Sequence, residues 1–172
     1  MLITTYNCLI NLHHRHGPRE FGKICQKMLA ISYHRAGFGH VVERGVQGVD
    51  LDAANGEIKY TTEVKTTISD SISFEEKDAA GLAARHADGY HRLLAVLQLK
   101  PLSDWLIVDA EYLEPGRLHL DTLRPYRRNE LETQLRTLFA AVVDEHGESS
   151  LTGAQAYLDK VLFRLGVEQQ DR

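Results

Sequence analysis

The chain has 172 residues, of which 43% are hydrophobic and 26% are charged, and its formal net charge is −4 at pH 7. These values are typical of one globular domain that is large enough for a sizeable hydrophobic core. No apolar run approaches the roughly 18 residues that a membrane-spanning helix requires. The sequence therefore excludes a protein with membrane-spanning helices, and we expect a soluble, cytoplasmic chain with no membrane partner.

The acidic balance weakens a nucleic-acid-binding interpretation without refuting it, because proteins that bind nucleic acids usually carry a basic surface. The charge is distributed unevenly along the chain. Residues 1–60 contain 7 Lys and Arg against 5 Asp and Glu, whereas residues 101–172 contain 8 against 13. The acidity is therefore concentrated in the C-terminal third.

Two helices separated by a polar linker are predicted at the N-terminus. Apolar residues recur at helical spacing over 2–12, and the run 13–17 (HHRHG) is typical of a linker. The second helix is predicted over 18–36, because Pro18 suits a first helical position and Gly37 suits a C-cap.

These helices contain one acidic residue and two cysteines whose roles need separate consideration. Glu20 falls in the first turn of the second helix, where the helix dipole favours a carboxylate. Cys8 and Cys25 lie in apolar helical surroundings, which indicates buried, reduced thiols rather than a disulfide.

Residues 45–67 carry the pattern around which the chain is organised. A strand predicted over 38–44 leads into this segment, and two further strand-like runs, Val49–Ala53 and Ile58–Thr66, flank Asn55-Gly56. An Asn-Gly pair between two strands is a strong signal for a tight β-hairpin.

Side chains alternate between the two faces of a strand, so this hairpin has an apolar face and a charged face. One face carries Val49, Leu51 and Ala53 from the first strand and Ile58, Tyr60, Thr62 and Val64 from the second. The other face carries Asp50, Asp52, Glu63 and Lys65. If the apolar faces point into the core together, the three acids and the lysine converge on the opposite side.

Carboxylates that converge on a sheet repel one another unless a cation neutralises them. Mg²⁺ suits such a cluster, because one or two carboxylates, several waters and substrate phosphate oxygens complete its coordination. A metal at this position would activate water and neutralise charge on a phosphodiester, and the lysine could position that water. The alternative is a solvated hairpin face on which Glu63 and Lys65 form an ordinary ion pair.

The middle of the chain predicts a helix followed by two buried strands. Ser73 and Glu76 fit a capping box, so we expect a helix that begins at Ser73 and ends near Ala87. The short aliphatic runs 93–99 and 105–110 are typical of buried strands. A helix between strands implies a crossover connection, and therefore a mixed sheet.

The C-terminal part begins with a turn at 114–116 and a short edge strand predicted over 118–123. The densest positive patch follows, and it could contact a nucleic-acid backbone or simply introduce the next helix; it consists of Arg124, Arg127 and Arg128 around Tyr126. Two amphipathic helices are predicted over 128–146 and 153–165, either packed on the sheet or forming a dimer interface.

The run Gly48-Val49-Asp50, followed by Glu63-Val64-Lys65-Thr66-Thr67, resembles the active-site hairpin of the PD-(D/E)XK nuclease superfamily. Its pattern is most similar to those of archaeal Holliday-junction resolvases and modification-dependent restriction enzymes. The upstream part of the family pattern, a helix with a glutamate and then Gly-aromatic and a strand, matches Glu20 and Gly37-Phe38. The match covers about residues 18–110, with Val49 in the place of the proline in the family's name.

The resemblance implies an α/β fold with a restriction-endonuclease-like mixed β-sheet flanked by helices. The nuclease-like core would comprise residues 1–125, and residues 126–172 would form a C-terminal helical extension. The resemblance also implies a metal-dependent endonuclease that hydrolyses DNA phosphodiester bonds, with Mg²⁺ as the cofactor and Mn²⁺ as a substitute. Cutting of two strands would be arranged by a homodimer.

Carried over residue by residue, the resemblance makes Asp50 and Glu63 the metal ligands and Lys65 the catalytic lysine. Glu20 becomes a supporting acid near the metal. Asp52 duplicates the acid two residues after Asp50, so the sequence leaves open which aspartate binds metal. It also leaves open a non-cleaving nucleic-acid-binding or assembly subunit that retains the nuclease fold. The substrate stays open among a duplex site, modified DNA, a junction and RNA.

Overall fold

The computed structural model describes residues 1–44 and 48–170, so the first three residues of the predicted 45–67 segment and the last two of the predicted extension lie outside the described part. The helices are α1 (Ile3–Arg35), α2 (Glu76–His86), α3 (Leu120–Leu123) and α4 (Asn129–Leu165), with a 3₁₀ turn over Arg124–Tyr126. The strands are β1 (His40–Arg44), β2 (Leu51–Asn55), β3 (Ile58–Thr67), β4 (Ser71–Phe74), β5 (His91–Gln98), β6 (Trp105–Asp109), β7 (Gly116–His119) and β8 (Glu168–Gln170).

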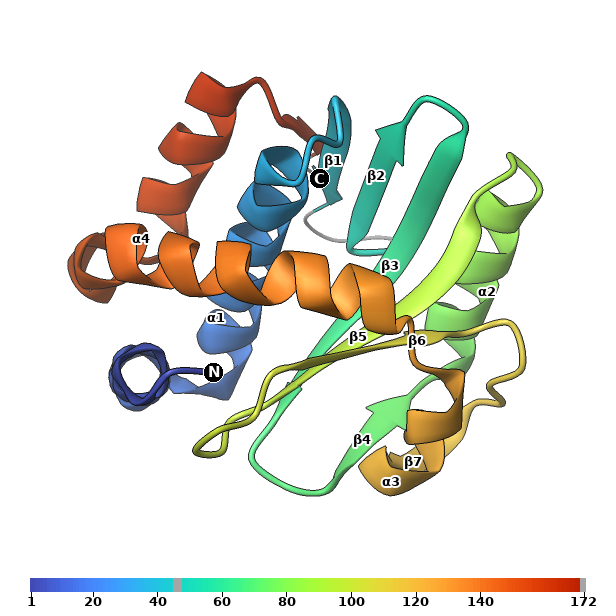
Figure 1. Ribbon diagram of the computed structural model, residues 1–172, viewed down its shortest axis with the longest axis horizontal. Coiled ribbons are helices and arrows are strands. Elements are labelled where there is room, and N and C mark those ends of the chain that lie inside the picture. The colour runs from blue at the N-terminus through green and yellow to red at the C-terminus, as the bar shows by residue number, and fades with distance from the viewer. Residues whose placement is uncertain (45–47, 171–172) are drawn as a thin grey trace.

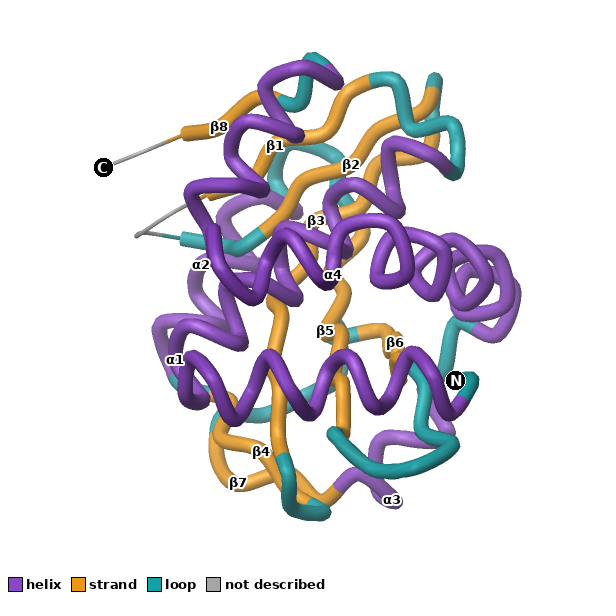
Figure 2. Tube along the Cα trace, turned by 90° about the vertical axis from the view of Figure 1, so that its left-hand side faces the viewer, coloured by secondary structure: helices purple, strands orange, loops and turns teal. Residues whose placement is uncertain are grey.

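Six of these strands form one mixed sheet in the order β6-β5-β3-β2-β1-β8. The pairs β3–β5 and β1–β8 are parallel, and the other neighbours are antiparallel. Strands β4 and β7 form a separate antiparallel pair. Both views show this pair with α3 at the lower end of the molecule, away from β1 and β2 (Figures 1 and 2). The predicted mixed sheet is therefore confirmed.

Helices cover both faces of the sheet, and the sequence of β5 shows why. Leu93, Ala95 and Leu97 belong to one buried cluster, which contains the apolar residues of α1 and α4. Leu94 and Val96, in the alternate positions, belong to a second cluster with residues of α2, β4 and α3. A strand buried on both faces needs a continuous aliphatic run, which is what β5 has.

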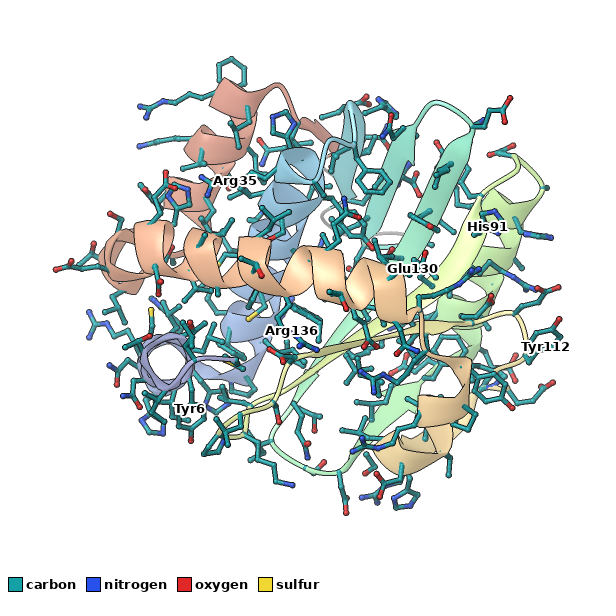
Figure 3. All side chains as sticks on the ribbon, in the orientation of Figure 1. Tyr6, Arg35, His91, Tyr112, Glu130 and Arg136 are labelled. Atoms are coloured by element: carbon teal, nitrogen blue, oxygen red, sulfur yellow. The ribbon has the colours of Figure 1, made fainter. Side chains whose placement is uncertain are left out.

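The helices α1 and α4 pack extensively on each other, and α4 crosses in front of α1 and of the sheet (Figure 1). Arg35 at the C-terminal end of α1 donates to Glu145 of α4 at 2.6 Å (Figure 3). In the described residues no helix is long and apolar enough to cross a membrane.

The predicted linker over residues 13–17 is wrong, because α1 continues through His16 and is interrupted only at Gly17. Gly17 has φ of 77°, which glycine adopts at little steric cost, and Pro18 restarts the helix after it. Similarly, the predicted gap between 146 and 153 is helical, and α4 is interrupted at Ala154 instead.

The start of α2 lies two residues later than predicted, because its N-cap is Glu75 rather than Ser73. Ser73 and Phe74 belong to β4, and the capping box is formed by Glu75 with Asp78 rather than by Ser73 with Glu76. The predicted edge strand over 118–123 is also only partly right, because β7 ends at His119 and α3 follows. Pairing of β7 with β4 explains both differences, since it extends the chain around Ser73 and ends opposite Ser71.

The hairpin is confirmed, with one change of facing. Leu51 and Ala53 pack under α1 as predicted, but Val49 packs in the cluster on the α2 face. Strand β2 begins only at Leu51, and Gly48 has φ of 85°, so the two-residue alternation does not extend back to Val49.

Candidate active site

A cavity of about 460 Å³ opens where the β2–β3 hairpin meets α1 and α2. The hairpin contributes Asp50, Glu63 and Lys65 to its wall, and the helices contribute further polar residues: Arg19, Lys23 and Gln26 from α1, and Lys77 and Asp78 from α2. Three of the four residues whose convergence the sequence predicts therefore line one cavity, and the fourth, Asp52, does not.

Alternation along β3 explains why Glu63 and Lys65 point the same way. Val64, between them, packs in the cluster under α1. Their partners on β5 are Leu94 and Val96, both on the α2 face of the sheet. The charged pair therefore lies on the face that α2 covers.

Two glycines lie where the helices approach the cavity closely. A Cβ built at Gly22 of α1 would lie 3.4 Å from the hydroxyl of Thr66 on β3. A Cβ at Gly81 of α2 would lie 3.2 Å from the carbonyl carbon of Gly48. The distance at Gly22 is that of an ordinary van der Waals contact, whereas the tighter approach at Gly81 favours glycine there.

Asp50 is fixed by two donors from different elements. The Val64 backbone N–H donates to Asp50 Oδ2 at 2.9 Å, and Lys23 Nζ lies 3.2 Å from Oδ1. The first contact ties Asp50 to β3 just beside Glu63, and the second ties it to α1.

Glu63 is a buried carboxyl group with only 5% of its surface exposed. Burial raises its pKa to about 8, the negative charge of Asp50 adds to this, and Lys65 at 2.8 Å opposes it. A carboxyl group in this environment is short of positive charge. A cation bound between Asp50 and Glu63 would supply it.

Lys65 lies between two acids, with its Nζ 2.8 Å from Glu63 and 2.6 Å from Asp78. Burial alone would lower the pKa of Lys65, but the two carboxylates outweigh it and the pKa is raised. The lysine is therefore a charged group held at a fixed position in the cavity wall.

Asp78 was not predicted from the sequence. It is 3% exposed, and its Oδ2 accepts from the Glu75 backbone N–H at 2.9 Å while also holding Lys65. The signal that could have found it is a second capping pattern, Glu75 followed three residues later by Asp78. The same carboxylate thus begins α2 and orients the lysine.

Asp52, the other candidate aspartate, does not line the cavity. It is fully buried and pairs with Arg44 at 2.7 Å and with Arg85 of α2 at 2.8 Å. Two guanidinium groups thus occupy the surroundings in which a metal ion would have to bind.

Glu20 also lies away from this cavity's wall. Its Oε2 accepts from the side-chain amide of Gln155 at 2.6 Å, so it connects α1 to the C-terminal half of α4. The three arginines of the positive patch each pair with a carboxylate: Arg124 with Asp121, Arg127 with Glu132 and Arg128 with Asp109.

The residues present fit a hard divalent cation with few protein ligands. Over residues 1–44 and 48–170 no group of three or more His, Cys, Asp or Glu side chains is arranged to hold a metal ion. Asp50 and Glu63 provide two carboxylates beside an open volume, and Mg²⁺ commonly takes one or two carboxylates and keeps several waters. A Zn²⁺ site, with its four nitrogen or sulfur ligands, does not fit this donor set.

Comparison with solved structures gives a match to Hjc, a Holliday junction resolvase from the archaeal hyperthermophile Archaeoglobus fulgidus. The TM-score is 0.54 at 18% sequence identity, and the match covers 65% of this chain and 95% of that one. No family model and no curated protein matches the sequence. The comparison shows the fold, a resolvase-like mixed sheet flanked by helices, as the sequence predicts.

Proposed function

We propose that this chain is a metal-dependent endonuclease that hydrolyses phosphodiester bonds in DNA. The observation that supports this most directly is the meeting of Asp50, Glu63 and Lys65 in one cavity wall. The fold, shared with a Holliday junction resolvase, supports it independently of these side chains.

Asp50 and Glu63 would hold Mg²⁺, with Mn²⁺ as a substitute, because they are the two carboxylates at the cavity. The metal supplies a bound water of lowered pKa and neutralises charge on the phosphate. Lys65, held by Asp78, would orient the attacking water or stabilise negative charge that develops on the phosphate. Glu20 has no part in this assignment, because it hydrogen-bonds Gln155 instead.

Substitution of Lys65 or Glu63 tests this function. We expect Lys65→Ala and Glu63→Gln each to abolish Mg²⁺-dependent cleavage of plasmid, junction and single-stranded substrates, and circular dichroism to show an intact fold. Lys59→Ala is the matched control, since Lys59 lies on the same strand and stands over the Tyr90 ring, outside the cavity. Undiminished cleavage by either site variant would refute the assignment.

A second candidate is a non-cleaving nucleic-acid-binding or assembly subunit with the same fold. It is favoured by the ion pairs of Lys65, because two carboxylates, those of Glu63 and Asp78, hold this lysine rather than one. Binding of DNA by the wild-type chain, with no cleavage in either Mg²⁺ or Mn²⁺, would select this candidate.

A homodimer remains part of the proposal, because a two-fold axis would place two such cavities on two DNA strands. The measurement is the molar mass in solution, with and without DNA. A monomer under both conditions would remove this part and leave the chemistry of a single cavity untouched.

A further inference from the structure

Two helices bring positive side chains to the rim of the cavity that contains Asp50 and Glu63. Arg19 and Lys23 come from α1, and Lys77 comes from α2. We propose that these three residues, which we call the phosphate clamp, bind the backbone phosphates of a nucleic-acid strand on both sides of the cavity. This inference rests on the proposed function and names the residues that hold its substrate.

The charge of the cavity lining is opposite in sign to that of the whole chain. Five of its residues are cationic (Arg19, Lys23, Arg44, Lys65 and Lys77) and three are acidic (Asp50, Glu63 and Asp78), although the chain carries −4. A polyanion is attracted to a local concentration of positive charge even on an acidic protein. The cavity rim is therefore where electrostatic attraction favours binding of a phosphate backbone most.

The clamp residues are available to a phosphate because their present partners hold them weakly. Arg19 is exposed and forms no ion pair within the described part of the chain. Lys77 is 77% exposed, and its one ion pair with residues that the structure describes is to Glu75, which is itself about half exposed. Ion pairs in water contribute little, so a phosphate can replace them at small cost. Arg44 differs, because buried Asp52 holds it.

Lys23 and Arg19 are four residues apart on one helix, so both face the cavity from the same side of α1. Lys23 lies 3.2 Å from Asp50, which places a positive charge next to a carboxylate of the proposed metal site. A cation at Asp50 would compete with Lys23 for that carboxylate, and Lys23 would keep its hydrogen bond to Gln26 at 2.8 Å. The clamp and the proposed metal site therefore adjoin each other at Asp50.

The arginine patch at 124–128, the densest positive run in the sequence, is less available to a phosphate than the clamp. Arg127 is held by Glu132, a carboxylate that is 3% exposed, and Arg128 is held by Asp109. Arg124 and Arg127 line a different cavity, next to β6 and α3. Arg124 pairs with exposed Asp121 and is as available as Lys77, but at Arg127 a phosphate must displace the buried carboxylate of Glu132. The salt dependence of DNA binding therefore distinguishes the two surfaces.

Fluorescence anisotropy of a labelled DNA duplex in EDTA, measured over a range of salt concentrations, tests the clamp without cleavage. We expect the Arg19→Ala, Lys77→Ala double variant to bind more weakly and to lower the slope of log K against log salt by about 0.9 for each phosphate that the protein no longer neutralises. Both side chains are exposed, so the variant should fold. Lys160→Ala, which removes an exposed lysine of α4 away from the cavity, should behave as wild type.

An unchanged slope in the double variant overturns the clamp, and so does a wild-type chain that binds no DNA. A loss of binding in an Arg124→Ala, Arg128→Ala variant, with none in the Arg19 and Lys77 variant, assigns the phosphate contact to the arginine patch and also overturns it. Cleavage in Mg²⁺ is measured separately. If the wild-type chain cleaves DNA and the slope in the double variant is unchanged, only the clamp is refuted. If the slope is lowered and the wild-type chain does not cleave, only the proposed nuclease activity is refuted.

Discussion

Asp50 and Asp52 lie two residues apart and have different surroundings. Asp50 lines the cavity, and its partners are a backbone N–H and a lysine that is one-third exposed. Asp52 is fully buried between the guanidinium groups of Arg44 and Arg85. Removing one partner from a buried ion-pair network leaves the other charges without compensation, which is costly. We therefore propose that Asp50 binds the metal and that Asp52 stabilises the fold.

The matched variants Asp50→Asn and Asp52→Asn separate these two roles. We expect Asp52→Asn to lower the free energy of unfolding by about 3 kcal/mol, because Arg44 and Arg85 lose the buried carboxylate that they share and Arg85 keeps only Asp88 among the described residues. Asp50→Asn should change it by less than about 1 kcal/mol, since the amide oxygen can still accept from Val64 and the lost pair with Lys23 is partly exposed. Urea denaturation measures both values.

Cleavage should show the opposite order, lost in Asp50→Asn and retained in the folded fraction of Asp52→Asn. If Asp52→Asn is as stable as wild type and inactive, the two aspartates have been assigned the wrong way round. That result would also make the partly buried pair of Arg44 and Arg85 a candidate for direct contact with the substrate.

Local sequence was enough to predict that Glu63 and Lys65 point the same way, because both lie in β3 and side chains alternate along a strand. The tight hairpin brings Asp50 beside them, but alternation also predicted Asp52 there, and Asp52 does not line the cavity. The role of Asp78 could not be predicted from local sequence, because the contact of Asp78 with Lys65 depends on how α2 packs against β3. The same holds for Glu20, whose partner Gln155 lies 135 residues further along the chain. Contacts between elements distant in sequence have no periodic signal.

Among the elements, the crossing of α1 and α4 depends on a glycine. A Cβ at Gly147 of α4 would overlap the Sγ atom of Cys8 on α1. Glycine otherwise destabilises the middle of a helix by roughly 0.5–1 kcal/mol relative to alanine. Close approach of the two helices therefore explains a residue that helix propensity alone disfavours.

A double-mutant cycle between Gly147 and Cys8 measures this contact. We expect Gly147→Ala to destabilise the chain by about 1–2 kcal/mol, because the methyl group forces Cys8 or the helix to move. In a Cys8→Ala background the same substitution should be neutral or stabilising, since the obstructing sulfur is gone and the propensity gain remains. Thermal or urea unfolding of the four proteins gives the coupling energy. Additive effects would show that the helices do not approach at this point.

Most elements could be predicted because hydrophobic periodicity is local, as in β5 and β6, whose aliphatic runs match the observed strands closely. The boundaries that failed were decided by other elements. Ser73 is a good N-cap residue, but pairing of β4 with β7 places it in a strand. Residues 13–16 look like a polar linker, yet His16 hydrogen-bonds the Ser150 carbonyl of α4, which supports the helix there.

At the scale of the molecule, α4 forms part of the main core. The larger buried cluster joins α1 and the sheet to eight residues beyond position 125: Leu131, Leu135, Phe139, Val142, Val143, Leu158, Leu162 and Val167. Glu132 of α4 also accepts from the Ile107 backbone N–H at 2.9 Å, so the helix is hydrogen-bonded to β6. Whether residues 1–125 form a core that folds without the extension can therefore be tested with a truncated chain.

We expect a chain that ends at residue 125 not to fold cooperatively. Each fully buried aliphatic or aromatic side chain contributes about 1.5–3 kcal/mol, so losing eight of them costs about 12–24 kcal/mol, as much as or more than the roughly 5–15 kcal/mol by which whole domains are stable. Thermal melting by circular dichroism and limited proteolysis measure this. The control is a chain that ends at Val167, which lacks β8 but keeps the cluster, and it should melt cooperatively at a lower temperature. A sharp transition and protease resistance in the 1–125 chain would instead make residues 126–172 an independent extension, with its apolar residues available for a dimer interface.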